Sequence, residues 1–376
     1  MQSSSVAPVS RLLFLDALRA FASVVILWHH FALYPPLSVQ ATPLLGGLVH
    51  WFHEYARSTQ VFFVVGGYVM ARTMSGGSWD SLAVWKFLAR RYCRLGIPYL
   101  AAIVLAIAAC AFGQGWLPDA VVGGVPTFLQ VFAHVFFLQE ILGFDHLSAG
   151  IWFVCINFQL GIIHVAALWL RDLLTRRMKL PVSSPWVDVP LIAGWLISLF
   201  SLFLFHDQPG ADSWAPYFYP YFFLGVLIHR ASMNRRGEVM FWVYLAVMVA
   251  AMCHEWRWRL ASALVVGLLL FLADKTGFAT CWPRARWVSR LGRVSYSLFL
   301  VHFPVLVIVS SVWARLGWTS PAAAMTGLFV AFAASVGAAF VFHRWVEEPA
   351  AALSRRWGSS WQETPATTVR LPADVG

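Results

Sequence analysis

Long apolar runs are the feature that most constrains this chain. They are roughly 15 to 23 residues long and recur along the sequence between short basic or Gly- and Pro-bearing stretches. A helix of about 20 apolar residues matches the roughly 30 Å hydrocarbon core of a bilayer. Only 12% of the residues are charged and 60% are apolar, whereas soluble domains carry about 25% charged residues. The sequence therefore predicts an all-α fold, a polytopic bundle of transmembrane helices.

About ten of these runs are long enough to be spanning helices. The predicted spans are Leu12–Tyr34, Thr59–Met74, Gly96–Phe112, Trp152–Leu170, Val189–Phe205, Pro216–His229, Val239–Cys253, Trp258–Ala273, Val294–Trp313 and Ala322–Phe342. An eleventh run, Val125–Leu142, carries Gln130, His134, Gln139 and Glu140. We interpret it as a re-entrant or surface segment on the outer face.

The basic residues support this interpretation, because Lys and Arg gather in cytoplasmic loops. If Val125–Leu142 does not cross, most basic residues outside the spans fall on one side, and both termini are cytoplasmic. Residues 113 to 150, which contain no Lys or Arg, then lie outside. The formal charge of +10 reflects orientation in the membrane rather than nucleic-acid binding, since the basic residues do not line one amphipathic face. We expect lipid as a partner and no nucleic acid; the sequence leaves the oligomeric state open.

The chain is expected to form one membrane domain, residues 1–353, followed by a short polar cytoplasmic tail, residues 354–376, that is disordered. The first apolar run lacks a preceding basic segment and a small-residue cleavage site, so we expect it to be retained. The five cysteines are scattered without a CxxC pair. They indicate neither a disulfide framework nor a metal site.

A polar stripe on the first predicted span is the strongest candidate for chemistry. Arg19 and His30 are eleven residues apart, which on a helix places them roughly 20° from the same azimuth. Asp16 and Ser23 lie close to that face. Charged side chains at membrane depth are costly, so the stripe is expected to face the bundle interior, where ionisable groups are commonly functional. The alternative is a structural Asp16–Arg19 pair with His30 at the outer interface.

Several segments resemble the acyltransferase 3 family of bacterial membrane acyltransferases. Arg19 and His30 match its Arg-x10-His motif, and residues 63–68 are similar to the Phe-x-x-Ser-Gly-Phe of its second helix, with Gly66 where Ser is usual. Residues 90–98 resemble the Arg-rich run before its third helix. Residues 295–304 are similar to its Ser-Tyr-x-x-Tyr-x-x-His-x-Pro, and residues 346–349 to its closing Glu-x-Pro. The order of these segments makes the resemblance specific.

The resemblance implies transfer of an acyl group, usually acetyl, from cytoplasmic acetyl-CoA to a hydroxyl of an extracytoplasmic carbohydrate or glycolipid, at the bacterial inner membrane. The implied catalytic residues are His30, Arg19 and Asp16. His30 would act as a general base or carry the acyl group, and Arg19 would polarise the thioester carbonyl or hold a phosphate. The basic residues expected to bind the coenzyme A phosphates are Arg72, Arg90, Arg91 and Arg94. Topological anchoring is the alternative for them.

The acceptor is expected to contact polar and aromatic residues near the outer face and between the helices. The candidates are Asn157, Gln159, Trp152, Glu140, His302 and Ser295. Asn157 stands where the family commonly has an acid, which puts a carboxylate role in doubt. Ordinary interhelical hydrogen bonds are the alternative for Asn157, Gln159 and His302.

A glycan or lipid transporter is the competing function, because carriers also place charged residues inside helices. The family segments favour the enzyme, and we find no inverted repeat in the sequence. A membrane scaffold without chemistry leaves the polar stripe unexplained.

Overall fold

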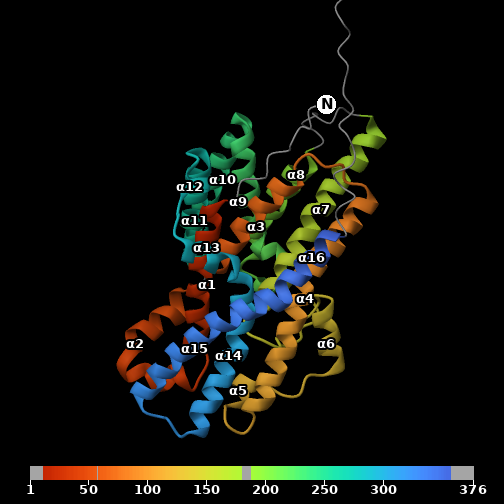
Figure 1. Cartoon of the computed structure of the whole chain (residues 1–376). Helices are drawn as coiled ribbons and strands as arrows, with labels where there is room; N and C mark the ends of the chain where they lie inside the picture. The colour runs from red at the N-terminus through yellow and green to blue at the C-terminus, as the bar shows by residue number, and fades with distance from the viewer. Residues whose placement is uncertain (1–11, 57, 180–187, 357–376) are drawn as a thin grey trace, which may run out of the picture.

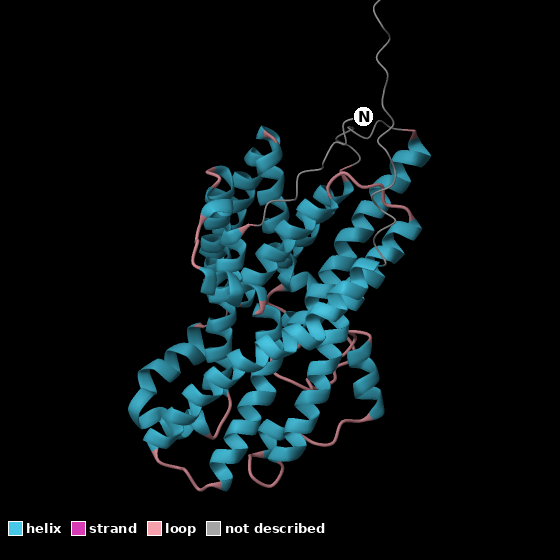
Figure 2. Cartoon of the chain, in the orientation of Figure 1, coloured by secondary structure: helices cyan, strands magenta, loops and turns pink. Residues whose placement is uncertain are grey.

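The computed structural model describes residues 12–56, 58–179 and 188–356. These residues form helices joined by short loops, and no strand occurs among them (Figure 2). Arg57 and residues 357–376 lie outside the described ranges, so most of the predicted tail does too.

Ten helices overlap the ten predicted spans. They are α1 (Leu13–Leu33), α3 (Thr59–Met74), α4 (Ser81–Gly113), α7 (Trp152–Met178), α8 (Val189–Phe200), α9 (Ala215–Met233), α10 (Arg235–His254), α11 (Trp258–Lys275), α14 (Ser295–Arg315) and α15 (Pro321–Phe342). In the described chain, six stretches are long and apolar enough to cross a membrane: α1, α4, α7, α10, α14 and residues 321–356. The all-α polytopic bundle is confirmed, whereas the number of crossings and the orientation stay predictions.

Two helices extend well beyond the predicted spans. The helix α4 begins at Ser81, where the Asp80 carboxylate caps it by accepting from the Ala83 amide, and α7 continues to Met178. The added turns are rich in Lys, Arg and Leu, which favour helix but lower the apolar content that marked the spans. Arg90, Arg91 and Arg94 therefore lie on a helix rather than in a loop before one.

The helix α2 (Leu37–Tyr55) was not predicted. It contains Pro43 and the pair Gly46 and Gly47, and its polar residues kept it from being recognised as a span. It packs against α1 and α15. Figure 1 places α2 at the same end of the molecule as the short helices α5 (Asp119–Val122) and α6 (Phe128–Val135).

The run Val125–Leu142 does not form a spanning helix. Its only regular element within the described chain is α6, whose eight residues extend about 12 Å. After α6 the backbone turns, and Phe137 adopts a left-handed conformation with φ of 57°. The run thus forms no helix long enough to span a bilayer, whereas its place on the outer face stays a prediction.

Glycines allow the closest helix contact, between α3 and α9. A Cβ atom at Gly67 would lie 1.9 Å from the Phe222 carbonyl oxygen, and one at Gly225 would lie 2.0 Å from that of Val64. Small residues at such crossings let helix backbones approach closely in membranes. This contact fixes α3 against α9.

The chain closes with α14, α15 and two shorter elements. A π-helix, η4 (His343–Glu347), links α15 to α16 (Glu348–Arg356). The hydroxyl of Ser354 donates to the Arg90 carbonyl, so α16 packs along α4 and its last three residues extend into the predicted tail. We call the end of the bundle that carries Arg72, Arg90 and the start of α1 the basic end, and the other the cavity end.

Candidate functional site

Two buried histidines from helices far apart in sequence form the centre of the site. His30 on α1 and His302 on α14 are 6% and 0% exposed. Nδ1 of His30 lies 2.7 Å from Nε2 of His302, and the rings stack with centroids 4.8 Å apart. The sequence singled out both residues, but their contact joins positions 272 apart in the chain.

The surroundings of His302 favour one position for the proton between the two rings. The backbone carbonyls of Phe299 and Leu298 act on the His302 ring, although Nδ1 of His302 has no aligned hydrogen-bond partner among the described residues. Carbonyl oxygens only accept, so they favour the neutral His302 tautomer with the hydrogen on Nδ1, in which Nε2 accepts from Nδ1 of His30. The lone pair of His30 then lies on Nε2, the nitrogen that a base would use.

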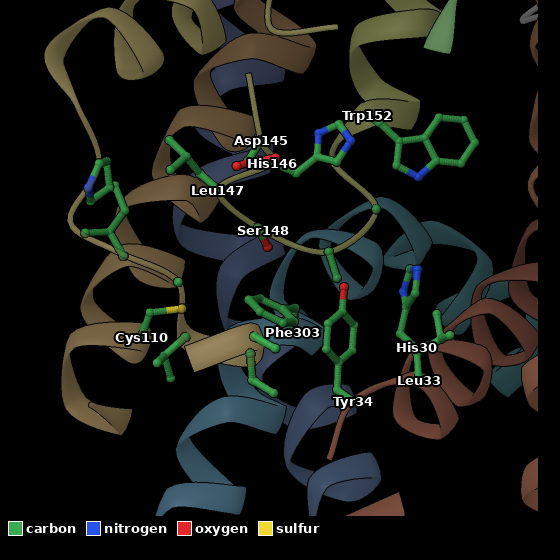
Figure 3. A pocket seen from close by; sticks show the side chains of 18 of the residues that line it. His30, Leu33, Tyr34, Cys110, Asp145, His146, Leu147, Ser148, Trp152 and Phe303 are labelled. Atoms are coloured by element: carbon green, nitrogen blue, oxygen red, sulfur yellow. The ribbon is translucent and has the colours of Figure 1, made fainter. Parts of the chain in front are cut away.

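His30 lines a cavity of about 1020 Å³ at the cavity end. Figure 3 shows the His30 ring and the Tyr34 hydroxyl directed into this space, beneath the segment that carries Asp145, His146 and Ser148. Gly150 lets that segment lie close to His30, because a Cβ at this position would lie 3.0 Å from Cε1 of His30. Its φ of +76° also favours glycine. Cys110 of α4 and Phe303 of α14 form further parts of the wall.

Arg19 lies toward the basic end, about 16 Å from His30 along the α1 axis. It is half-buried, and the charged groups that act on it are Arg94 of α4, Glu347 of η4 and Asp16. Glu347 accepts from the Ser297 hydroxyl at 2.5 Å, and it lies 2.9 Å from Nδ1 of His343. Arg19 thus faces the interior between α1, α4 and η4, as the stripe predicted, but it does not line the cavity.

Arg91 and Asn157 are brought together. The Arg91 guanidinium donates to the Asn157 backbone carbonyl at 2.7 Å and to its side-chain oxygen at 3.3 Å. Gly161 leaves room for it, because a Cβ there would lie 2.6 Å from Nε of Arg91. Arg91 is therefore committed to joining α4 and α7.

The other three predicted coenzyme-binding arginines are less constrained. Arg94 is exposed, and Arg90 and Arg72 are half-buried. A bond of 3.4 Å joins Arg72 to the Tyr68 hydroxyl, which itself donates to Asp274. All three lie at the basic end of the bundle.

The predicted acceptor residues divide into two sets. Trp152 and Glu140 line the cavity, and Nε2 of His146 lies 3.2 Å from the Glu140 carboxylate. Burial, with a contribution from the charge of Asp212, raises the pKa of Glu140 to about 7. Gln159 does not line the cavity.

Gln159 and Ser295 have other surroundings. The Gln159 amide donates to the Phe137 carbonyl at 3.0 Å. Ser295 is fully buried two turns before His302, and its hydroxyl has no hydrogen-bond partner among the described residues.

The cavity also contains residues that sequence reasoning did not assign to a site. They are Tyr34, Asp119, Ser148 and Asp212, together with Arg259. They come from five separate parts of the chain, and their only sequence signal is their position at predicted span ends on the outer side. Tertiary packing alone brings them together.

Comparison with known proteins gives one match. The family model described as an acyltransferase domain, of the acyltransferase 3 family, matches residues 12–344. No curated protein and no solved structure shows significant similarity to the chain. Because the match covers nearly the whole chain, from the start of α1 to the π-helix after α15, the chain belongs to the acyltransferase 3 family and is a membrane acyltransferase.

Proposed function

We propose that this protein transfers an acetyl group from acetyl-CoA at the basic end to a hydroxyl of a glycan or glycolipid in the cavity, with His30 as the general base. The observation that carries the proposal is the His30–His302 pair at the wall of a cavity of about 1020 Å³. In a bacterial inner membrane the basic end would face the cytoplasm.

His302 is proposed to hold His30 in the productive tautomer. A base needs an unprotonated nitrogen within hydrogen-bond reach of the attacking hydroxyl, and its partner fixes which nitrogen that is. With Nδ1 bound to His302, Nε2 of His30 takes the proton of the acceptor hydroxyl while the oxygen attacks the thioester carbon. The proton then passes to the leaving coenzyme A thiolate.

The donor is proposed to enter from the basic end. Two guanidinium groups that act on each other, Arg19 and Arg94, suit a phosphate of the donor, because a bound anion relieves their mutual repulsion. The thioester would then extend about 16 Å along α1 from these arginines to reach His30. Arg72 and Arg90 would extend this surface. Arg91 would contribute through the position of α4 against α7, since its Nη2 donates to Asn157. Asp16 and Glu347 would orient Arg19.

The acceptor is proposed to lie against Trp152 and below the segment of Asp145 and Ser148 (Figure 3). Aromatic faces and carboxylates together bind sugar rings and their hydroxyls. The proposed acceptor site and donor site thus lie at opposite ends of the bundle.

The test compares His30→Asn with wild type, using purified protein, radiolabelled acetyl-CoA and a panel of glycans. The amide nitrogen of Asn stands in for Nδ1, so it can keep the bond to His302 but offers no Nε2. We expect transfer to fall by about 10² to 10⁴. His29→Asn is the matched control: His29 also lines the cavity, but its Nδ1 binds the Phe52 carbonyl and not His302, so this variant should stay active. Equal transfer by wild type and His30→Asn would refute the role of His30, and transport of a glycan without labelling would favour a carrier.

A further inference from the structure

The charge of the cavity differs from that of the protein. The chain carries a formal charge of +10, yet the cavity is lined by four carboxylates and one guanidinium, those of Asp119, Glu140, Asp145, Asp212 and Arg259. Arg259 lies 3.4 Å from Asp212, so these two largely offset each other. Asp119 and Asp145 are exposed and leave the cavity net negative.

A second observation concerns an unpartnered hydroxyl on a residue that lines this space. Ser148 is only 3% exposed, its hydroxyl has no hydrogen-bond partner within the described ranges, and it lies on the cavity wall near Tyr34 and Phe303 (Figure 3). A buried hydroxyl without a partner costs free energy unless a ligand or water satisfies it. Ser148 is two residues from Gly150, where an added Cβ would lie 3.0 Å from Cε1 of His30.

From these observations we infer that the acceptor is an uncharged or cationic hydroxyl compound, such as a neutral or amino sugar, and that the cavity rejects acceptors bearing carboxylate, sulfate or phosphate. This inference rests on the proposed function, since it concerns the acceptor of that reaction. Low-dielectric walls with one sign of charge concentrate ions of opposite sign and repel like ions. The anionic donor is compatible with this because it meets the arginines of the basic end instead.

Cys110 offers a measurement of the cavity charge that does not depend on activity. It lines the cavity, whereas Cys253 is exposed on α10 and is absent from the cavity wall. In full-length chains that keep only Cys110 or only Cys253, with the other cysteines replaced by Ser, we would compare reaction rates with cationic and anionic methanethiosulfonates. The ratio of the two rates cancels the intrinsic reactivity of each thiol.

We expect the cationic-to-anionic ratio to be about tenfold higher at Cys110 than at Cys253. Asp119→Asn combined with Asp145→Asn should lower the ratio at Cys110 and leave that at Cys253 unchanged. A ratio at Cys110 no higher than at Cys253, no effect of the double substitution, or no reaction of Cys110 even with a neutral reagent would each overturn the inference.

Transfer assays supply the second arm, with matched oligosaccharides of glucose, glucosamine and glucuronate. Labelling of the neutral or cationic oligosaccharide above the anionic one supports the inference. Preferential labelling of glucuronate would refute it while leaving the proposed acetyl transfer intact. If no acceptor is labelled, the proposed function fails on these substrates, and the thiol-labelling ratio still decides the charge of the cavity.

Discussion

Replacing His302 tests whether His30 depends on its partner. His302→Leu keeps a buried apolar side chain of similar size but leaves Nδ1 of His30 without an acceptor, and an unpaired buried donor costs about 1–3 kcal/mol. If that cost raises the free energy of the productive tautomer, the kcat/KM for the acceptor should fall by at least about fivefold, since about 1.4 kcal/mol corresponds to tenfold. If His30 instead moves its hydrogen to Nε2, the loss should approach that of His30→Asn. In His302→Gln the side-chain oxygen takes the place of Nε2, so activity should remain within about tenfold of wild type.

The assay is initial-rate acetyl transfer by purified protein, varying the acceptor at saturating acetyl-CoA and then the reverse. The KM for acetyl-CoA should be unchanged in both variants, because the proposed donor site lies at the basic end. Thermal unfolding and size-exclusion profiles establish that both variants fold. Equal activity of His302→Leu and His302→Gln, or full activity of His302→Leu alongside an inactive His30→Asn, would refute the reasoning.

Four further predictions concern other parts of the structure. Arg94→Ala should raise the KM for acetyl-CoA by about 10- to 100-fold, as expected for the loss of a charge-assisted bond of about 1.5–3 kcal/mol, and should leave the melting temperature unchanged. Arg91→Ala should lower the melting temperature, because it removes the hydrogen bond between α4 and α7. Gly225→Ala should destabilise the fold by about 1–3 kcal/mol or more through overpacking. Gly337→Ala is the control and should not destabilise it, because a Cβ at Gly337 meets nothing within 4 Å. The measurement is the free energy of unfolding in detergent. The pKa of Glu140 is raised to about 7 in the folded state, so the wild type loses stability as the pH rises from about 4.5 to 7. Glu140→Gln lacks this ionisation, and its melting temperature should therefore rise relative to that of wild type between pH 5 and pH 8. A difference in melting temperature that does not change with pH would contradict this. Asp145→Cys should react with an impermeant thiol reagent from outside intact cells, and labelling only from the cytoplasm would reverse the predicted orientation.

Helices whose apolar content matches a bilayer were predictable from the sequence, while those with mixed content were not. Thr59–Met74 matches α3 at both ends, because a nearly continuous apolar run from Val61 to Ala71 forms most of the helix. The start of α4 was missed by fifteen residues, since its Arg-rich turns are helical but not apolar. The helix α2 was missed for a related reason: Gly46, Gly47 and Pro43 resemble loop residues, yet packing against α1 and α15 holds the helix.

The candidate site was predictable only where it follows helical periodicity. The inward direction of Arg19 and His30 follows from 3.6 residues per turn. Contacts between distant helices depend on tertiary packing, which helical periodicity does not encode. They include the pairs His30–His302 and Arg91–Asn157, and the shared cavity of Asp119, Ser148 and Asp212. Of Arg19 and His30, only His30 lines the cavity, because eleven residues of helix separate it from Arg19 by about 16 Å along α1.

The backbone at Phe137 links the interior of the bundle to the cavity wall. A bulky residue with φ of 57° is strained by about 1–2 kcal/mol. Bonds from Gln159 and Cys155 of α7 to the Phe137 carbonyl and packing on Tyr99 and Phe158 hold it in place. Three residues later comes Glu140. A substitution at Gln159, which does not line the cavity, can therefore shift Glu140 on the wall of the proposed acceptor site without altering any residue of that wall.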